Sequence, residues 1–191
     1  DDLKSIPTLS LVMKIGDMFG SKGVYANPQE RGSAWERPVS VEYFDPATGQ
    51  EFQADAGVHV VGGLSREPQY KKHGLRLVFR SRYGPPQLEF PLFGEGVAER
   101  FDAIQLRSEF TDSWTWFHPS LEHRGVGTYL RDKFVRRTQR AMGHPSPHGK
   151  YVHLYINGFY WGLYDAHERP DELFMETYFG GQEGEWDIIK H

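Results

Sequence analysis

Residues 151–164 have the sequence YVHLYINGFYWGLY, and this stretch decides the fold. Its Asn157-Gly158 pair is typical of a two-residue type I′ turn, because both turn positions need a positive φ that Asn and Gly tolerate. Apolar and polar residues alternate on both sides of the turn, which predicts two antiparallel strands. The stretch therefore predicts a β-hairpin with its turn at residues 157–158.

The turn also fixes which residues face each other across the predicted hairpin. It pairs Leu154 with Trp161 on an apolar face. It places Gly162 opposite His153 on the other face, which is rich in tyrosine. A glycine there leaves a gap beside the sheet, for which two explanations stay open. Either a planar ligand approaches this face, or another layer of the same protein packs against it.

The rest of the chain is also rich in predicted strands. Aromatic residues make up 15% of the 191 residues, and 21 Gly with 12 Pro favour strands and tight turns over a helical bundle. Alternating apolar residues predict further strands around residues 9–13, 39–43, 52–60, 75–79 and 103–106. We therefore expect an α+β fold with a mostly antiparallel sheet and one main helix.

That main helix is predicted over residues 128–142. Leu130 and Phe134 share an apolar face of it, and its arginines lie elsewhere. Thr128 can cap the start of the helix, and Gly143 suits a left-handed residue at its end.

A second helix is predicted from Pro170 to about Phe179, because proline favours the first helical position and Asp171 with Glu172 favour the first turn. A short connector at residues 165–169 is expected to join this helix to the hairpin.

Composition excludes several classes of function. The chain has no Cys, which removes disulfide scaffolds, thiolate zinc sites and Cys nucleophiles. A net charge of −4 argues against a dedicated nucleic-acid-binding protein. No apolar stretch approaches the roughly 18 residues that a membrane-spanning helix needs.

Histidine spacing and charge distribution leave two questions open. The pairs His118/His123 and His144/His148 have spacings that a zinc site could use, but neither adjoins a carboxylate cluster, so no metal site is predicted. Basic segments at residues 66–82 and 124–150 contrast with an acidic stretch at residues 165–191. These segments either frame an anionic ligand or form solvated faces that pair with one another.

Three stretches carry a resemblance to a known family. They are DSW at 112–114 with YLRD at 129–132, RTQRAMG at 137–143, and YINGFYWGLY at 155–164 with HER at 167–169. In these stretches the chain resembles the spore-coat-protein-H (CotH) family of atypical protein kinases. The long hairpin phrase makes the resemblance specific, and together with shorter N-terminal stretches it covers most of the chain.

The resemblance implies a kinase-like architecture. It predicts a β-rich, nucleotide-binding small lobe over residues 1–164, and a hinge with the start of a truncated, helical second lobe over residues 165–191. Relatives carry two catalytic or metal-binding aspartates in motifs downstream of the hairpin, and this sequence contains neither motif. We therefore expect a fragment that binds ATP, with no catalytic residue of its own.

The whole protein is then expected to use ATP and Mg²⁺ to phosphorylate Ser residues of surface or secreted proteins. The resemblance favours a location outside the cytoplasm, at the cell or spore surface. The identity of the protein substrate is left open.

Candidate site residues follow from the order of strand, helix, hairpin and connector. Arg66 follows the glycines at 62–63 and could close over phosphates. An ammonium group just before the next strand could pair with phosphate, and backbone groups of a hinge could bind adenine. The predicted nucleotide-binding residues are Arg66, Lys71, Lys72, Asp165, His167 and Glu168, and Arg131 with Asp132 are expected to organise the lobe.

Each candidate also has a simpler explanation. The two lysines could protect a solvated strand edge, and Asp132 could form a surface i,i+4 pair with Arg136. The family's glycine-rich stretch after Leu106-Arg107 is replaced here by residues 108–111, and Glu109 adds negative charge near any phosphate.

The alternative function is a non-catalytic surface or adhesion module. Such a module would bind a protein or a glycan through the aromatic face of the hairpin, because a fold does not establish a chemistry.

Overall fold

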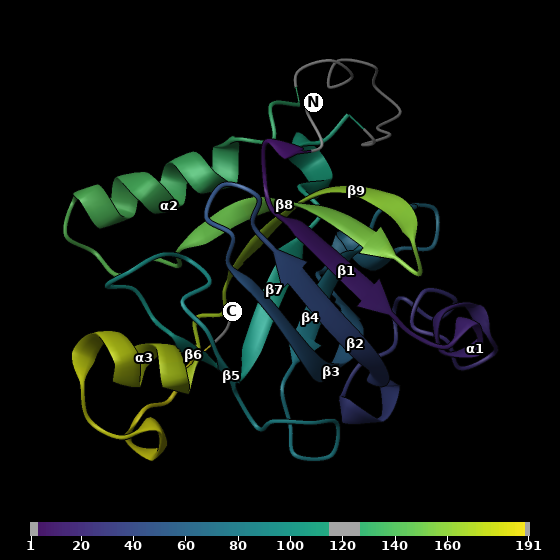
Figure 1. The fold of residues 1–191 in the computed structure, drawn as a ribbon, viewed down its shortest axis with the longest axis horizontal. Coiled ribbons are helices and arrows are strands. Elements are labelled where there is room, and N and C mark those ends of the chain that lie inside the picture. Colours follow the sequence, from purple (N-terminus) through teal and green to yellow (C-terminus); the bar gives the residue numbers. More distant parts are fainter. Residues whose placement is uncertain (1–3, 115–126, 190–191) are drawn as a thin grey trace.

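The computed structural model describes residues 4–114 and 127–189, in which seven strands form a closed barrel. Going around the barrel, the strands are β1 (Thr8–Val12), β2 (Arg37–Phe44), β3 (Glu51–Val61), β4 (Gly74–Val78), β7 (Ala103–Arg107), β9 (Phe159–Glu168) and β8 (Gly149–Ile156) (Figure 1). Neighbouring strands are antiparallel except β1 and β8, which are parallel. The fold is α+β with a mostly antiparallel sheet, as predicted.

The other elements lie outside this barrel. Helices α1 (Ile15–Phe19), α2 (Arg131–Ala141) and α3 (Glu172–Phe179) surround it (Figure 1). Strands β5 (Leu88–Glu89) and β6 (Arg100–Phe101) form a separate two-stranded sheet.

The hydrophobic core fills the inside of the barrel. On β2, Val39, Val41 and Tyr43 are buried, whereas Glu42 and Phe44 between and beyond them are exposed. This period of two is the pattern that the sequence shows, because successive side chains of a strand point to opposite faces. The predicted alternation therefore identifies the inward-facing residues of this strand correctly.

The hairpin has the predicted turn but a different register. Asn157 has φ 50° and Gly158 has φ 81°, as a type I′ turn requires. A β-bulge follows: Tyr155 pairs with Tyr160, but Leu154 pairs with Gly162, which leaves Trp161 as the extra residue. The predicted pairing of Leu154 with Trp161 is therefore wrong.

The bulge changes which residues enter the core. Gly162 has φ 126°, a value that a side chain would strain, so glycine permits the bulge. Beyond it Tyr164 is fully buried in the barrel, whereas Trp161 is only partly buried and contacts Tyr25. The large aromatic residue in this part of the core is thus the tyrosine.

Replacing Leu154 by Ala should lower the free energy of unfolding by about 2–5 kcal/mol, because the leucine is fully buried in a closed core. Phe159→Ala on the same hairpin should change it by less than about 0.5 kcal/mol, since Phe159 is 73% exposed. Urea unfolding of both variants measures this. Equal losses in the two variants would show that the inward and outward faces are misplaced.

Helix α2 packs with its basic side toward the barrel. Phe134 and Val135 are exposed, whereas Arg136 is buried. The apolar face that the sequence indicates therefore faces outward. The helix begins at Arg131. Its N-cap residue, Leu130, provides no side-chain hydrogen bond to cap it.

A distant carboxylate supplies the cap instead. Asp112, at the end of the 3-10 helix Phe110–Asp112, accepts hydrogen bonds from the backbone N–H groups of Arg131 (3.0 Å) and Thr128 (2.9 Å). The predicted capping residue, Thr128, accepts only from Leu130 N–H (3.2 Å). Gly143 ends the helix with φ 83°, as predicted.

The second predicted helix is confirmed as α3. The Asp171 side chain accepts a hydrogen bond from Phe174 N–H at 3.1 Å and caps its start, and Gly180 with φ 78° ends it. The connector differs from the prediction, because β9 continues through Glu168 and pairs there with β7. Most of the expected turn at residues 165–169 is therefore strand.

Candidate functional site

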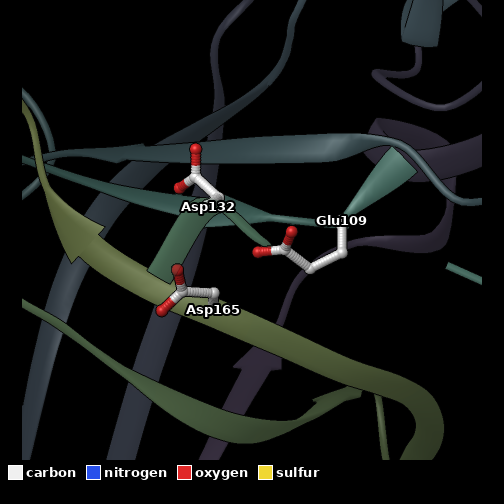
Figure 2. A group of neighbouring side chains, drawn as sticks. All are labelled: Glu109, Asp132 and Asp165. Carbon is white, nitrogen blue, oxygen red and sulfur yellow. The ribbon is translucent and has the colours of Figure 1, made fainter. Parts of the chain in front are cut away.

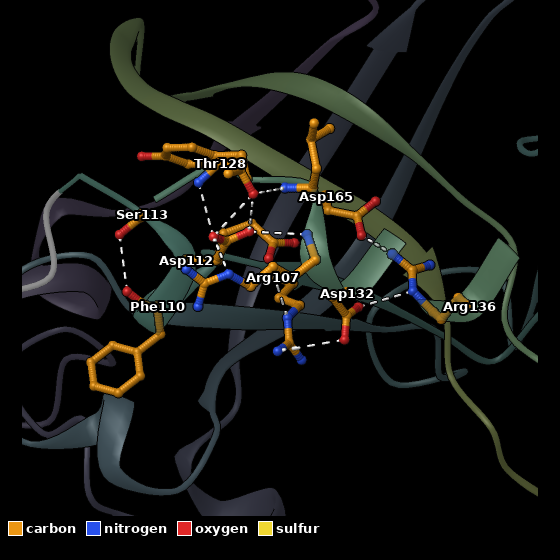
Figure 3. Close-up of polar contacts among 12 residues, drawn as sticks. Arg107, Phe110, Asp112, Ser113, Thr128, Asp132, Arg136 and Asp165 are labelled. Atoms are coloured by element: carbon orange, nitrogen blue, oxygen red, sulfur yellow. Dashed lines mark hydrogen bonds and ion pairs between the residues drawn. The ribbon is translucent and has the colours of Figure 1, made fainter. Parts of the chain in front are cut away.

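Charged side chains from β7, α2 and β9 meet at one edge of the barrel. Arg107 ends β7 and lies opposite Asp165 of β9 in the strand pairing. The side of α2 that faces them carries Asp132 and Arg136. Figure 3 shows these residues linked by ion pairs. The network connects the helix to two neighbouring strands.

Arg136 is the buried centre of this network. Its Nε donates to Asp132 Oδ2 at 2.9 Å, and its Nη2 forms an ion pair with Asp165 Oδ2. Its Nη1 donates to the Pro147 carbonyl at 3.3 Å. Asp165 is completely buried, so this guanidinium is the charge that compensates it.

Arg107 is more loosely held. Its Nη2 lies 3.5 Å from Asp132 Oδ1, and its Nε lies 3.7 Å from Glu109 Oε2. The side chain is 49% exposed. Contacts of this length on a half-exposed arginine are weak, so Arg107 can turn toward solvent or toward a ligand.

Glu109 is an unusual residue in this setting. It is buried, and its backbone is left-handed with φ 56°. Its Oε1 is buried without a hydrogen-bond partner, and so is Asp165 Oδ1. Burial raises the pKa of Glu109 to about 7 and that of Asp165 to about 6, although neighbouring arginines lower both.

Glu109→Gln tests this raised pKa. A carboxyl whose pKa is higher in the folded state than in the unfolded state stabilises the folded protein fully at pH values below 4.5, its ordinary pKa. That stabilisation is lost as the pH rises through its folded-state pKa of about 7. Relative to Glu109→Gln, the wild type should therefore lose stability between these pH values. Urea unfolding at pH 5 and pH 8 measures the difference, and a constant difference would contradict it.

A cavity of about 300 Å³ lies beside this network. One wall is the loop that follows β3, with its two consecutive glycines, and the opposite wall is the end of β7 with the residues after it. Its lining residues are Val61, Gly62, Gly63, Leu64, Ser65, Gly74, Gln105, Leu106, Arg107, Ser108, Phe110, Thr111 and His167. Glycines, hydroxyl-bearing residues and one arginine thus line a common space.

Arg66 lies next to this loop but points into the protein. Its Nε donates to the Pro28 carbonyl at 2.7 Å, and its Nη2 donates to the Glu30 carbonyl. In this conformation the guanidinium anchors the N-terminal segment. A contact between Arg66 and a nucleotide stays a prediction.

The two lysines lie in different environments, before β4 rather than within it. Lys71 is exposed and donates to the Pro68 carbonyl at 3.3 Å. The Lys72 ammonium donates to the Leu163 carbonyl at 2.6 Å and lies over the rings of Tyr164 and Tyr129. Burial lowers the pKa of Lys72 to about 8. A role of either lysine in nucleotide binding stays a prediction.

Lys72 also occupies the space beside Gly162. A Cβ at position 162 would lie 3.4 Å from Lys72 Cε. Of the two explanations for this gap, packing by the same protein is the one observed. The residue paired with His153 is Leu163, not Gly162.

The predicted hinge residues belong to β9 and have separate partners. His167 lines the cavity and lies with Nδ1 2.7 Å from the Glu168 carbonyl, and burial lowers its pKa to about 4. Glu168 accepts from His148 N–H at 2.6 Å and from the Tyr178 hydroxyl at 2.7 Å. Asp165 is in the charged network instead.

The two residues expected to organise the lobe both lie at the start of α2. Arg131 forms an ion pair with Asp112, with 3.1 Å between Nε and Oδ1. Asp132 forms the i,i+4 pair with Arg136 and also contacts Arg107 of β7.

The histidine pairs give no metal site in the part of the chain that is described. His118 and His123 lie outside the described residues. His148 contacts Glu168 and Tyr178, and it is not part of a cluster with His144. Within residues 4–114 and 127–189, the one group of three potential ligands consists of Glu109, Asp132 and Asp165.

Sequence reasoning did not identify Arg107, Arg136 or Glu109 as site residues. Arg107 could have been found from its place directly before residues 108–111, which replace the family's glycine-rich stretch. Glu109 could have been found because it puts a negative charge within that stretch. Nothing in the sequence pattern indicates that Arg136 is the buried arginine of its helix.

The sequence model of the CotH kinase protein family matches residues 58–190. The chain belongs to this family. The matched region contains the glycine loop, the cavity, the charged network and the hairpin. A search of curated proteins found no match to this chain. Among the residues described, no helix of the chain is long and apolar enough to cross a bilayer.

Proposed function

We propose that this chain binds ATP in the cavity beside Gly62 and Gly63, as the nucleotide-binding lobe of an atypical protein kinase. In protein kinases a glycine-rich loop covers the phosphates, and a cation on the third strand pairs with a carboxylate on the following helix. Here a glycine loop joins β3 to β4, the next barrel strand along the chain is β7, and α2 follows. The order of elements supports a kinase-like small lobe.

The observation that carries the proposal is the Arg107–Asp132 pair. Arg107 ends the third strand of this series, Asp132 lies in the first turn of the helix, and their nearest atoms are 3.5 Å apart. This pair takes the place of the lysine–glutamate pair of ordinary kinases. Because Arg107 also lines the cavity, its guanidinium can reach a phosphate there.

The rest of the cavity supplies groups that suit a nucleotide. Ser65, Ser108 and Thr111 offer hydroxyl donors, and the glycine loop allows close approach of backbone N–H groups. A volume of about 300 Å³ is at the lower end for a ligand pocket, so part of the nucleotide would extend outside it.

Phosphoryl transfer is proposed for the whole protein rather than for this chain. Transfer needs phosphate-bound Mg²⁺ and a carboxylate that orients the acceptor. Among the described residues, those that line the cavity include no carboxylate, so this lining does not fit the nucleotide's Mg²⁺. The proposed acceptors are Ser residues of surface or secreted proteins. If this chain alone transferred phosphate from ATP to a Ser-rich protein, and EDTA abolished the transfer, the proposal that the chain binds ATP without transferring its phosphate would be contradicted.

A second candidate function is adhesion through the hairpin tip. Phe159 is 73% exposed and Tyr160 is 50% exposed, and such exposed aromatic residues suit contact with a glycan or a protein. Binding of a glycan that Phe159→Ala abolishes, without binding of ATP, would favour this function.

Calorimetric titration of ATP into the chain and two variants tests the ATP proposal. Thr111 is exposed and lines the cavity, so Thr111→Trp should block it and abolish binding. Thr138→Trp makes the same change at an exposed position of α2 and should leave affinity unchanged. Equal affinities of the two variants would exclude this cavity as the site.

A further inference from the structure

Glu109, Asp132 and Asp165 converge from three separate elements of the fold. One carboxylate oxygen of each lies within 4.8 Å of one from each of the other two. Figure 2 shows the Glu109 carboxylate extending from its loop toward the two aspartates. None of the three lines the proposed nucleotide cavity, so this cluster is a separate feature.

A second observation distinguishes this cluster from an ordinary group of acidic residues. Glu109 is 2% exposed and Asp165 is 0% exposed, yet Glu109 Oε1 and Asp165 Oδ1 have no hydrogen-bond partner. Buried polar oxygens almost always have a partner, and a bound ion is one partner that would satisfy both of these.

The charges around the cluster show which group a cation would replace. Three carboxylates face the guanidiniums of Arg107 and Arg136, and the Lys133 ammonium also acts on Asp165. Arg107 is half exposed and its contacts are 3.5 and 3.7 Å, so it is the group that can leave. If Arg107 turns to solvent, a divalent cation can take its place beside the three carboxylates.

We propose that Glu109, Asp132 and Asp165 form a binding site for a divalent cation of the Ca²⁺ type, which fills as Arg107 turns away. Ca²⁺ takes six to eight oxygen ligands at about 2.3–2.6 Å in irregular geometry, whereas Mg²⁺ demands a near-ideal octahedron at about 2.0–2.1 Å. Carboxylates on a strand, a helix and a loop give an irregular arrangement, which suits Ca²⁺ better. Ion binding does not require ATP, but the site shares Asp132 with the Arg107–Asp132 pair of the ATP proposal.

Terbium luminescence tests the site without nucleotide. Tb³⁺ replaces Ca²⁺ and emits when a nearby tyrosine is excited, and Tyr151 of β8 pairs directly with Asp165 of β9. We expect one site on the wild-type chain, from which Ca²⁺ displaces Tb³⁺ more effectively than Mg²⁺ does. Failure of Ca²⁺ to displace Tb³⁺ would overturn the proposal.

Three variants locate the ion. Glu109→Gln and Asp132→Asn should each weaken Tb³⁺ binding at least roughly tenfold, because each removes a charged ligand. Glu36→Gln is the matched control: Glu36 is also a buried glutamate between two arginines, Arg80 and Arg82, and its variant should bind normally. If Glu109→Gln binds as tightly as the wild type, the ion lies elsewhere and the proposal is wrong.

Arg107→Met separates this proposal from the ATP proposal. Removing the guanidinium removes a positive charge from the cluster, so cation binding should be retained or tightened. The same change should weaken ATP binding. If Arg107→Met lost cation binding, the proposal that the cation replaces Arg107 would be wrong. If its ATP affinity were unchanged, only the ATP proposal would be contradicted.

Discussion

Arg136→Leu should lower the free energy of unfolding by about 3–5 kcal/mol, which is the expected cost of breaking a buried ion pair from one side. The change leaves Asp165, which is completely buried, without its compensating charge. It also removes the 2.9 Å hydrogen bond to Asp132 that ties α2 to the barrel edge. Urea unfolding at pH 8, where Asp165 is ionised, should give the largest loss.

The neighbouring arginine provides the control for this loss. Arg137 is exposed on the same helix, so Arg137→Leu should change stability by less than about 0.5 kcal/mol. The double variant Arg136→Leu/Asp165→Asn should recover part of the stability, because no unpaired charge then remains buried. Equal losses for Arg136→Leu and Arg137→Leu would show that the network does not hold α2 in place.

Arg107→Met should weaken ATP binding by roughly tenfold to a hundredfold, since a hydrogen bond to a charged group contributes about 1.5–3 kcal/mol. Stability should change little, because the side chain is half exposed and its two ion pairs are long. Calorimetric titration of ATP into the wild type and the variant measures the effect.

Arg100→Met is the matched control for nucleotide binding. Arg100 is 51% exposed and ion-paired with Glu176 at 3.1 Å, so it matches Arg107 in exposure and charge but does not line the cavity. Its variant should bind ATP as the wild type does. Equal weakening in both variants would indicate a diffuse electrostatic effect rather than contact between Arg107 and phosphate.

Local signals in the sequence predicted the elements of the fold well. The Asn157-Gly158 turn, the strand alternation and the end of α2 at Gly143 all depend on residues that are close in the chain. The bulge at Trp161 escaped prediction, because it depends on how β9 fits between β8 and β7. A glycine at position 162 signals a special backbone position, but it does not say which neighbour becomes the extra residue.

The candidate site was harder to predict because its parts are distant in the sequence. Asp132 and Asp165 were identified from the family resemblance, but their common partner, Arg136, lies on a helix whose amphipathic pattern points its apolar face to solvent. Tertiary pairing of charges decided the orientation of this helix instead. The pairing of β7 with β9, which helps to close the barrel, could not be predicted because it joins residues that are far apart in the sequence.

Backbone NMR of the ¹⁵N-labelled chain during titration with ATP tests the central proposal most directly, because each lining residue reports separately. We expect the largest shift changes at Gly62, Gly63 and Ser108, with little change in the separate groove that Tyr178 and Phe179 line. Unchanged spectra at saturating ATP, or changes centred on that groove, would contradict the assignment of a nucleotide-binding lobe.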